Sequence, residues 1–351
     1  MASREPIVDL PEPSRRVTSF DVAERAGVSQ STVSRALSGS QVITEDTRAR
    51  VVAAARELGY FVDSRAARLR TGRTGAIGVV VIGRQGDGPS EFNPFHYVLL
   101  GSICAAASKA GYQALVSFQA TPDEFYGEYV ERGQADGLIV IGTTLNSLAW
   151  DYFGEIASAH ASMAIWGAPI AHRARVRSDN RAGARLAIAR LVAAGHERIV
   201  FLGETDSPQQ QFRERYEGYC AAMEAHGLVP QEPVTAAGAT RNAQGYGAVD
   251  ALLAEGRDFD AVFSACDAMA LGALERLGEA GRDVPGEIGV IGFDGLGSGT
   301  YSNPPLTTIE PDFQRAGTLL VDAALAAQQD QVEQLVPVRL IERASVRPPL
   351  R

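Results

Sequence analysis

From residue 76 onward, short apolar runs alternate with segments of helical periodicity, and this alternation limits the folds open to the chain. The apolar runs include 76–82 (AIGVVVI), 113–118, 137–142, 162–167, 198–203, 261–267 and 288–294. Helices are expected between them, near 95–110 and 123–133 and over 181–195, 212–226 and 268–280. Continuous apolar strands that alternate with helices are typical of βαβ units in a parallel sheet covered on both faces. The strands are too many for one compact sheet, so we expect an α/β body with two lobes.

The cellular compartment is predicted from the absence of membrane-spanning and signal-peptide segments in the sequence. No apolar run approaches the roughly 18 residues of a membrane span. The N-terminus MASREPIVDL has no apolar signal-peptide core, so we expect a cytoplasmic, nucleoid-associated protein. Cys104, Cys220 and Cys266 lie far apart without a CxxC motif, which argues against disulfides or a zinc site. The histidines show no metal-ligand spacing, and we expect no cofactor.

The net charge of −9 argues at first against a nucleic-acid partner, but the charge is unevenly distributed. Residues 14–74 contain eleven arginines and six acidic residues, a net charge of +5. The first 13 residues carry −2, so the other 277 residues carry −12. This division predicts a small anion-binding head attached to a large acidic body with a different task.

Three short amphipathic helices are predicted between residues 18 and 59. Thr18 and Asp21 have the spacing of a capping box at the start of the first helix. Gly27 stands where a tight turn needs a residue that tolerates positive φ, and Ser29 can cap a second helix over 30–37.

The spacing of Ala23, Gly27 and Val33 is that of a helix-turn-helix, in which the second helix enters the major groove of DNA. Glutamine can pair with adenine and arginine with guanine, and the exposed polar positions of this helix are Gln30, Ser31 and Arg35. Taken alone, the spacing also fits a plain three-helix bundle with solvated polar faces.

The stretches 17–39 (VTSFDVAERAGVSQSTVSRALSG) and 47–60 (TRARVVAAARELGY) resemble the DNA-binding head of the lac-repressor (LacI/GalR) family of bacterial transcription regulators. Ala66 and Leu69 match the A-x-x-L pattern of that family's hinge. The resemblance covers residues 17 to 346 and includes, in the family's order, the blocks 178–199, 215–219, 261–274, 284–295 and 304–313.

The resemblance implies roles for the head and the hinge. Hydroxyl groups of the head would bind phosphates, which fix register, and a folded hinge would insert Leu69 into a central base step of the minor groove. The expected DNA-binding residues are Thr18, Ser29, Gln30, Ser31, Thr32, Arg35, Thr47, Ala66, Arg68, Leu69 and Arg70. The hinge departs from the family pattern at Val62, Asp63 and Ala67.

The resemblance also implies a domain plan. We expect a disordered tail over 1–16, a head over 17–62, a hinge over 63–75 and an effector-binding and dimerisation domain of the periplasmic-binding-protein type over 76–351. Lobe one would comprise about 76–173 and 311–333, and lobe two about 174–310 and 334–346.

A small ligand is expected between the lobes. By the resemblance, its contacts are Phe95, Trp166, Asp179, Arg215, Thr240, Cys266 and Asp294. Aromatic faces suit the apolar faces of sugars or flat bases, and an arginine fork pairs with vicinal hydroxyls or a carboxylate. Phe95 and Trp166 could equally be core residues, and Asp179 could be a helix cap.

We therefore predict a ligand-responsive repressor that binds palindromic operator DNA as a homodimer and is released by a small carbohydrate. The alternatives are a corepressor-dependent regulator, with a purine-like ligand or a phosphoprotein partner, and a sugar-binding transport protein. An enzyme is not expected, because no G-x-S-x-G, P-loop or metal-ligand cluster is present.

Overall fold

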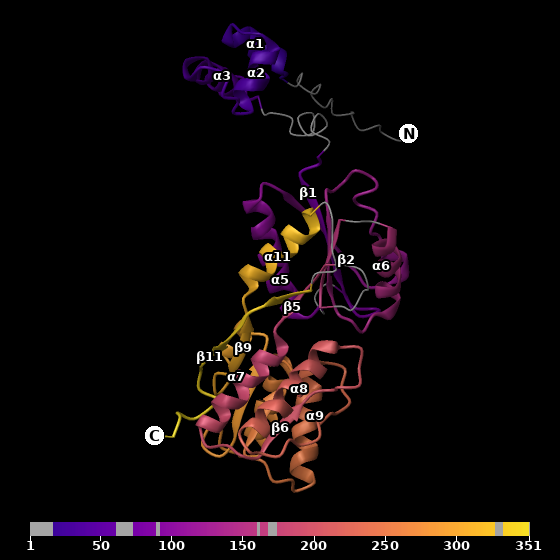
Figure 1. Ribbon diagram of the computed structural model, residues 1–351, viewed down its shortest axis with the longest axis vertical. Coiled ribbons are helices and arrows are strands. Elements are labelled where there is room, and N and C mark those ends of the chain that lie inside the picture. Colours follow the sequence, from indigo (N-terminus) through magenta and orange to yellow (C-terminus); the bar gives the residue numbers. More distant parts are fainter. Residues whose placement is uncertain are drawn as a thin grey trace, which may run out of the picture. The chain divides into compact units, whose positions relative to one another are not determined.

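The computed structural model describes residues 17–60, 73–88, 92–159, 162–167, 174–326 and 333–350. The chain divides into two compact units, residues 1–73 and 74–351, and each is described by itself. The first unit holds the head, and the second holds the α/β body with two sheets (Figure 1).

The head is a bundle of three helices, α1 (Ser19–Ala26), α2 (Gln30–Leu37) and α3 (Glu45–Glu57). Val22, Val33 and Val51, one from each helix, are fully buried in its centre. Alanines surround these valines, and their short side chains let the three helices approach closely. The predicted capped start of the first helix and the predicted bounds of the second are confirmed.

The first lobe is built on a sheet whose strands all run parallel, in the order β10-β5-β4-β3-β1-β2. The strands are β1 (Ala76–Ile82), β2 (Gln113–Gln119), β3 (Leu138–Gly142), β4 (Met163–Trp166), β5 (Ala174–Ser178) and β10 (Glu333–Val336). Helices cover both faces, with α5 (Pro94–Lys109) and α11 (Phe313–Leu325) on one and α6 (Ser147–Ala159) on the other (Figure 1).

The second lobe has the sheet order β11-β9-β8-β7-β6, and only β11 runs antiparallel to its neighbour. Its strands are β6 (Ile199–Leu202), β7 (Ala261–Ser264), β8 (Gly289–Phe293), β9 (Thr307–Pro311) and β11 (Val338–Ile341). One face packs against α7 (Asn180–Ala193) and α8 (Gln210–Ala225), the other against α9 (Arg241–Ala254) and α10 (Asp267–Glu279). The α/β body with two lobes is thus confirmed. Two 3₁₀ turns complete the body, η2 (Pro122–Glu124) and η3 (Gly297–Thr300).

The chain crosses between the lobes three times, after β5, after β9 and after β10. The crossings lie side by side: the Asp179 N–H donates to the Val336 carbonyl, and the Asp312 N–H donates to the Pro337 carbonyl. The lobe boundaries expected near 173 and 333 are therefore displaced. Residues 174–178 and 334–336 belong to the first lobe, because β5 and β10 pair with each other in its sheet.

The helix expected near 123–133 is wrong. That segment forms η2 followed by irregular turns, and Gly127 packs so closely against α6 that a Cβ there would lie 2.5 Å from the Ile156 side chain. Its backbone is held by side chains instead of by a helical ladder, with the Tyr126 N–H donating to Gln119 and the Gly127 N–H to the Tyr152 hydroxyl.

Candidate DNA-binding face and effector cavity

The start of each of the first two helices is fixed by a hydroxyl side chain. Thr18 and Asp21 form the predicted capping box, in which the Thr18 N–H donates to the Asp21 carboxylate at 2.7 Å. Gly27 ends the helix with a φ of 65°, a conformation that suits glycine. Ser29 then caps α2 by accepting a hydrogen bond from the Thr32 N–H. These caps set the angle at which α2 leaves the turn.

One face of α2 is polar and open to solvent. Gln30, Ser31 and Arg35 are exposed, and Arg35 forms no ion pair with any residue that the structure describes. Thr18 and Ser29 are also exposed, whereas Thr32 and Thr47 are half-buried. The arrangement places long hydrogen-bonding side chains, Gln30 in the first turn and Arg35 in the last turn, on a helix narrow enough for the major groove.

The hinge predictions cannot be compared with the fold. Ala66, Arg68, Leu69 and Arg70, and the atypical positions Val62, Asp63 and Ala67, lie outside the described residues.

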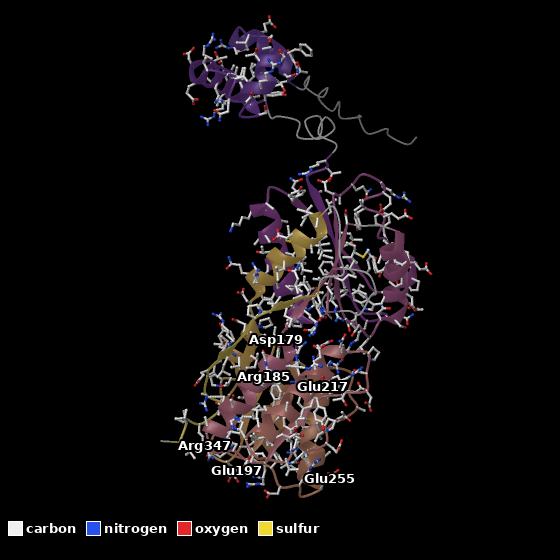
Figure 2. All side chains as sticks on the ribbon, viewed as in Figure 1. Asp179, Arg185, Glu197, Glu217, Glu255 and Arg347 are labelled. Atoms are coloured by element: carbon white, nitrogen blue, oxygen red, sulfur yellow. The ribbon has the colours of Figure 1, made fainter. Side chains whose placement is uncertain are left out.

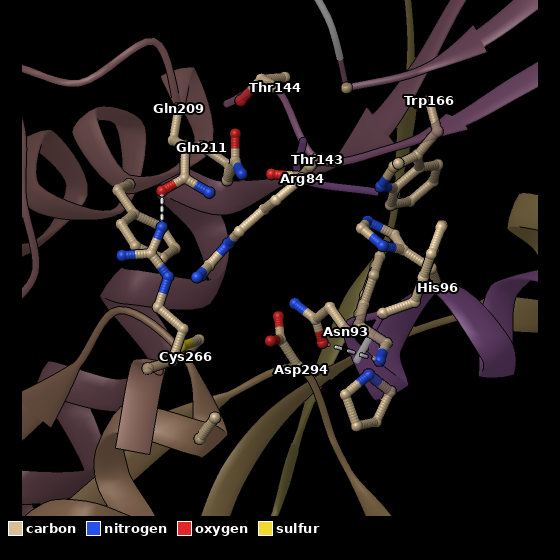
Figure 3. Close-up of a pocket in the computed structure, with 18 of the residues that line it drawn as sticks. Arg84, Asn93, His96, Thr143, Thr144, Trp166, Gln209, Gln211, Cys266 and Asp294 are labelled. Carbon is tan, nitrogen blue, oxygen red and sulfur yellow. Dashed lines mark hydrogen bonds between the residues drawn. The ribbon is translucent and has the colours of Figure 1, made fainter. Parts of the chain in front are cut away.

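A cavity of about 460 Å³ lies between the two lobes of the body. The first lobe contributes residues that follow β1 and β3, the start of α5 and the end of β4. The second lobe contributes the starts of α8, α9 and α10 and the residue after β8. The carboxyl ends of parallel strands are where open α/β sheets bind ligands. Figure 3 shows polar side chains from both lobes converging on this space.

Arg215 of α8 is buried at the back of the cavity. Its Nε donates to Asn180 Oδ1 at 3.0 Å, and its Nη1 donates to the Ala265 carbonyl and lies 3.3 Å from Asp294 Oδ1. The guanidinium also lies 3.5 Å from the centroid of the Phe293 ring. Burial lowers the pKa of Arg215, and the Asp294 carboxylate opposes this shift. The guanidinium is therefore held rigidly by four partners.

Asp294 follows β8 and has a φ of 121°, which a residue with a side chain rarely adopts. Such strain costs about 1–3 kcal/mol and occurs most often at functional sites. Burial raises the pKa of this carboxyl to about 6, against the opposing effect of Arg215. A carboxylate offers about four acceptor positions. With Arg215 bound to one oxygen, Asp294 can still accept hydrogen bonds from ligand hydroxyls.

The opposite wall is aromatic. Phe95 and Trp166 belong to the hydrophobic core and also line the cavity, with ring centroids 5.8 Å apart. The His96 ring packs edge-on against Phe95, and burial lowers the pKa of His96 to about 4. This imidazole is therefore neutral near pH 7 and acts as a polar group without charge in an otherwise apolar wall.

The three remaining predicted ligand contacts are helix caps. Thr240 and Cys266 line the cavity as the N-caps of α9 and α10. Burial raises the pKa of the Cys266 thiol to about 12, so this side chain is uncharged. Asp179 does not line the cavity; its carboxylate accepts a hydrogen bond from the Ala182 N–H and caps α7 (Figure 2). Asp179 lies at the end of β5, as expected, but its carboxylate is already hydrogen-bonded to the backbone of α7.

Several cavity residues stand in no recognisable motif, although they carry a common signal in the sequence. They are polar side chains just after an apolar strand or at the start of a helix. They include Arg241 and, labelled in Figure 3, Arg84, Asn93, His96, Thr143, Thr144, Gln209 and Gln211. Parallel strands bring such positions to one edge of each sheet, so the pattern itself could have identified them.

An ion-pair network joins the lobes beside the cavity. Arg177 of β5 pairs with Glu214 of α8 at 2.6 Å and with Glu333 of β10 at 2.7 Å. Glu214 is buried and also accepts a hydrogen bond from Asn180. Arg177 and Arg175 hold the pKa of Glu333 at about 2. The network ties the carboxyl end of β5 in the first lobe to a cavity-lining helix of the second lobe.

Two other kinds of site are not found in the described part of the chain. None of its groups of His, Cys, Asp and Glu side chains could hold a metal ion. Nor does any helix there combine the length and the apolar character that a membrane crossing requires.

A helix-turn-helix head and a two-lobed body with a cavity for a small molecule define a ligand-responsive transcription regulator. Residues 20–62 match the bacterial regulatory proteins of the lacI family, and residues 188–346 match the periplasmic binding protein-like domain. The chain belongs to the LacI family of bacterial transcription regulators.

The similarity to individual relatives extends over nearly the whole chain. The HTH-type transcriptional regulator CelR of Thermobifida fusca is 31% identical over 344 residues, which cover 95% of this chain and 99% of that protein. AscG of Escherichia coli K12 is 32% identical and is covered over 86% of its length by 84% of this chain.

Solved structures agree with this assignment. The lac repressor dimer bound to operator and the anti-inducer ONPF has a TM-score of 0.71 at 26% identity, covering 94% of this chain and 99% of that one. The CelR–cellobiose complex has a TM-score of 0.64 at 27% identity, covering 94% of this chain and all of that one.

Proposed function

We propose that this protein is a repressor that binds a palindromic operator as a homodimer in the cytoplasm and is released when a small carbohydrate enters the cavity. The assignment of a carbohydrate ligand rests on the different chemistry of the two opposite walls of the cavity. Arg215 and Asp294 offer fixed hydrogen-bonding groups on one side, and Phe95 and Trp166 offer aromatic faces on the other. A sugar ring has hydroxyls at its edge and apolar C–H faces, which match these two walls.

Relatives support the same ligand class. One solved relative is a complex of CelR with cellobiose, and another is the lac repressor bound to ONPG in a repressed state. The ribose operon repressor of E. coli K12 is 29% identical over 337 residues.

The DNA side of the proposal rests on α2. Gln30 and Arg35 would read base edges, while hydroxyls such as Thr18 and Thr47 would bind phosphates. In the hinge, Leu69 would act as the minor-groove wedge. Leu69→Ala should weaken specific operator binding far more than nonspecific binding, and an equal loss in both would remove the wedge from the proposal.

The homodimer is needed because a palindrome presents two half-sites. A surface that suits a second copy lies on lobe one, where β2 is an edge strand beside α5. Large apolar side chains are exposed there: Tyr97 and Val98 on α5, and Val116 on β2, which has the same strand parity as the α5-facing residues Ala114 and Phe118. We propose that the partner subunit covers this surface. Val116→Glu should shift the dimer towards monomer in sedimentation analysis, and an unchanged dimer would place the interface elsewhere.

The proposal is tested with operator DNA selected from a random pool. Operator affinity is measured by fluorescence anisotropy while carbohydrates are titrated. We expect one carbohydrate to weaken operator binding at least tenfold. Arg215→Ala and the milder Asp294→Asn should bind the operator normally and lose this response, whereas Arg185→Gln, on the exposed part of α7, should retain it (Figure 2). A ligand that strengthens operator binding would establish the corepressor-dependent alternative instead.

A further inference from the structure

The charges around the cavity do not balance once the ion pairs are assigned. Four arginines line it, namely Arg84, Arg177, Arg215 and Arg241. Arg177 pairs with Glu214, and Arg215 pairs with Asp294. Among the described residues, Arg84 and Arg241 form no ion pair at all. Asp87 also lines the cavity, but its carboxylate accepts a hydrogen bond from the Arg84 backbone N–H and forms no ion pair with either guanidinium in the described structure. Within the described part of the chain, neither the Arg84 nor the Arg241 guanidinium therefore has a carboxylate within ion-pair distance.

Arg84 comes from the first lobe, two residues after β1. Its backbone N–H donates to the Asp87 carboxylate, but its guanidinium reaches across to the second lobe and donates to the Ala239 carbonyl at 2.9 Å. Figure 3 shows its side chain extending into the space in front of Asp294 and Cys266. A neutral carbonyl satisfies one of the five N–H donors of a guanidinium and none of its charge.

Arg241 comes from the second lobe, at the first position of α9. Its guanidinium donates to the side-chain oxygens of Gln209 and Gln244, both neutral, and lies 5.0 Å from the centroid of the Phe212 ring. Burial lowers the pKa of Arg241, and the nearby Arg84 lowers it further, while Cys266, Glu204 and Asp294 raise it. The two guanidinium groups thus repel each other across the cavity.

Two further features favour a negative charge here. The helices α8, α9 and α10 all begin at the cavity, and neither Gln209 nor Cys266 caps its helix with a side-chain hydrogen bond. Helix N-termini carry partial positive charge. Independently, the Thr144 hydroxyl in the cavity wall is buried and has no hydrogen-bond partner in the described structure. A buried hydroxyl without a partner is unusual unless a ligand supplies one.

We propose that the effector is an acidic carbohydrate, a sugar that carries a phosphate or carboxylate group, and that Arg84 and Arg241 bind this group from opposite lobes. The inference rests on the proposed function and names its ligand more narrowly. The sugar ring lies against Asp294, Arg215 and the aromatic wall, and the anionic group lies between the two arginines. Because the arginines belong to different lobes, the anion replaces their repulsion with attraction and favours one relation between the lobes.

The test compares each neutral sugar with its acidic counterparts by isothermal titration of the full-length protein. The probes are glucose, galactose, ribose and cellobiose, the corresponding sugar phosphates and uronic acids, and inorganic phosphate alone. Arg84→Gln and Arg241→Gln are measured beside Arg185→Gln, which removes the same charge from an exposed position outside the cavity. Circular dichroism and operator binding verify that each variant is folded.

We expect an acidic sugar to bind at least tenfold more tightly than its neutral parent, since hydrogen bonds to charged groups are the strong ones. Each cavity variant should lose most of this preference, and Arg185→Gln should keep it. Comparison of phosphates with uronic acids identifies the acidic group.

Other outcomes separate this inference from the proposed function. If a neutral sugar binds tightly, its acidic counterparts bind no better, and both cavity variants bind like the wild type, the acidic-ligand inference is overturned and the carbohydrate-responsive repressor stands. If inorganic phosphate binds as tightly as any sugar phosphate, the site recognises the anion alone and the inference also fails. If neither neutral nor acidic sugars bind, the proposal of a carbohydrate effector is overturned together with the acidic-ligand inference.

Discussion

At the scale of single residues, the pair formed by Arg215 and Asp294 shows how burial sets the chemistry of the cavity. The Asp294 carboxyl is removed from water, and only Arg215 and the more distant Arg241 oppose the resulting rise of its pKa to about 6. It is therefore ionised at neutral pH but close to its titration range. A hydrogen-bond acceptor with such a pKa makes ligand binding depend on pH.

We expect ligand affinity to fall as the pH drops through about 6. The raised pKa means that Asp294 becomes protonated below that value, so its acceptor capacity is present above pH 6 and lost below it. Affinity at pH 5 should be about tenfold lower than at pH 7, from the ionised fraction of a group with this pKa.

Neighbouring groups do not titrate in that window. His96 has a pKa of about 4 and Cys266 of about 12, while the buried Asp267 has a pKa of about 8 and stays protonated below pH 6. Calorimetric titration between pH 5 and 6.5, with a probe that has no pKa of its own in this range, measures the effect. The Asp294→Asn protein should bind weakly at every pH. A wild-type affinity that does not change with pH would show that the carboxylate does not contact the ligand.

The sequence predicts some cavity residues better than others. Arg215 and Asp294 were found because they stand in recognisable motifs, and Asp294 also ends an apolar strand. Arg84 and Thr144 follow strands in the same way, but no motif marks them. Arg241 cannot be identified in this way, because its position depends on α9, whose sequence lacks a clear helical pattern.

At the scale of elements, α9 shows why some helices escape prediction. Its sequence RNAQGYGAVDALLA contains Gly245 and Gly247, which weaken the helical pattern. The reason for Gly245 is tertiary: a Cβ there would lie 1.9 Å from the Met269 carbonyl oxygen of α10. Conversely, a Cβ at Gly272 of α10 would lie 2.0 Å from the Asn242 carbonyl oxygen. Only the packed pair of helices makes these glycines necessary.

Glycine-to-alanine substitutions test this packing. Gly245→Ala should lower the free energy of unfolding by about 1–3 kcal/mol, because the helices must separate to admit the methyl group. Gly278→Ala in α10 is the matched control, since a Cβ there meets no atom within 4 Å. It should be neutral or stabilising by up to about 1 kcal/mol. Urea denaturation followed by circular dichroism measures both, and equal effects would contradict the proposed contact.

The strands were more predictable than the helices. The runs at 76–82, 198–203 and 288–294 became β1, β6 and β8 with bounds shifted by at most one residue at either end. Strands buried on both faces are continuous in apolar residues, a signal that needs no tertiary information. β5, with the sequence ARVRS, lacks that signal because its arginines serve the ion-pair network between the lobes.

At the scale of the whole molecule, the uneven distribution of charge separates the two tasks. The basic segment from 14 to 74 contains the head, and the remaining residues after it carry a net charge of −12. An acidic body repels the DNA backbone, so nonspecific binding is left to the small heads. This division lets a protein with a net charge of −9 bind DNA.

Operator affinity should therefore fall steeply with salt. Phosphate contacts release counterions, and a dimer with about 6–10 such contacts loses roughly 10³-fold or more in affinity between 50 and 200 mM salt. Arg35→Ala should weaken operator binding and relax its sequence preference. Anisotropy titrations at several salt concentrations provide the measurement. An affinity independent of salt would be incompatible with the head as the DNA-binding unit.

The central claim is that a carbohydrate bound beside Asp294 controls DNA binding by the head. The most direct measurement is operator affinity with and without a saturating carbohydrate ligand, for the wild type and for Asp294→Asn. The account predicts equal operator affinities without ligand, and a ligand-induced loss of at least tenfold in the wild type alone. A ligand that binds the cavity of the wild type while leaving its operator affinity unchanged would contradict it.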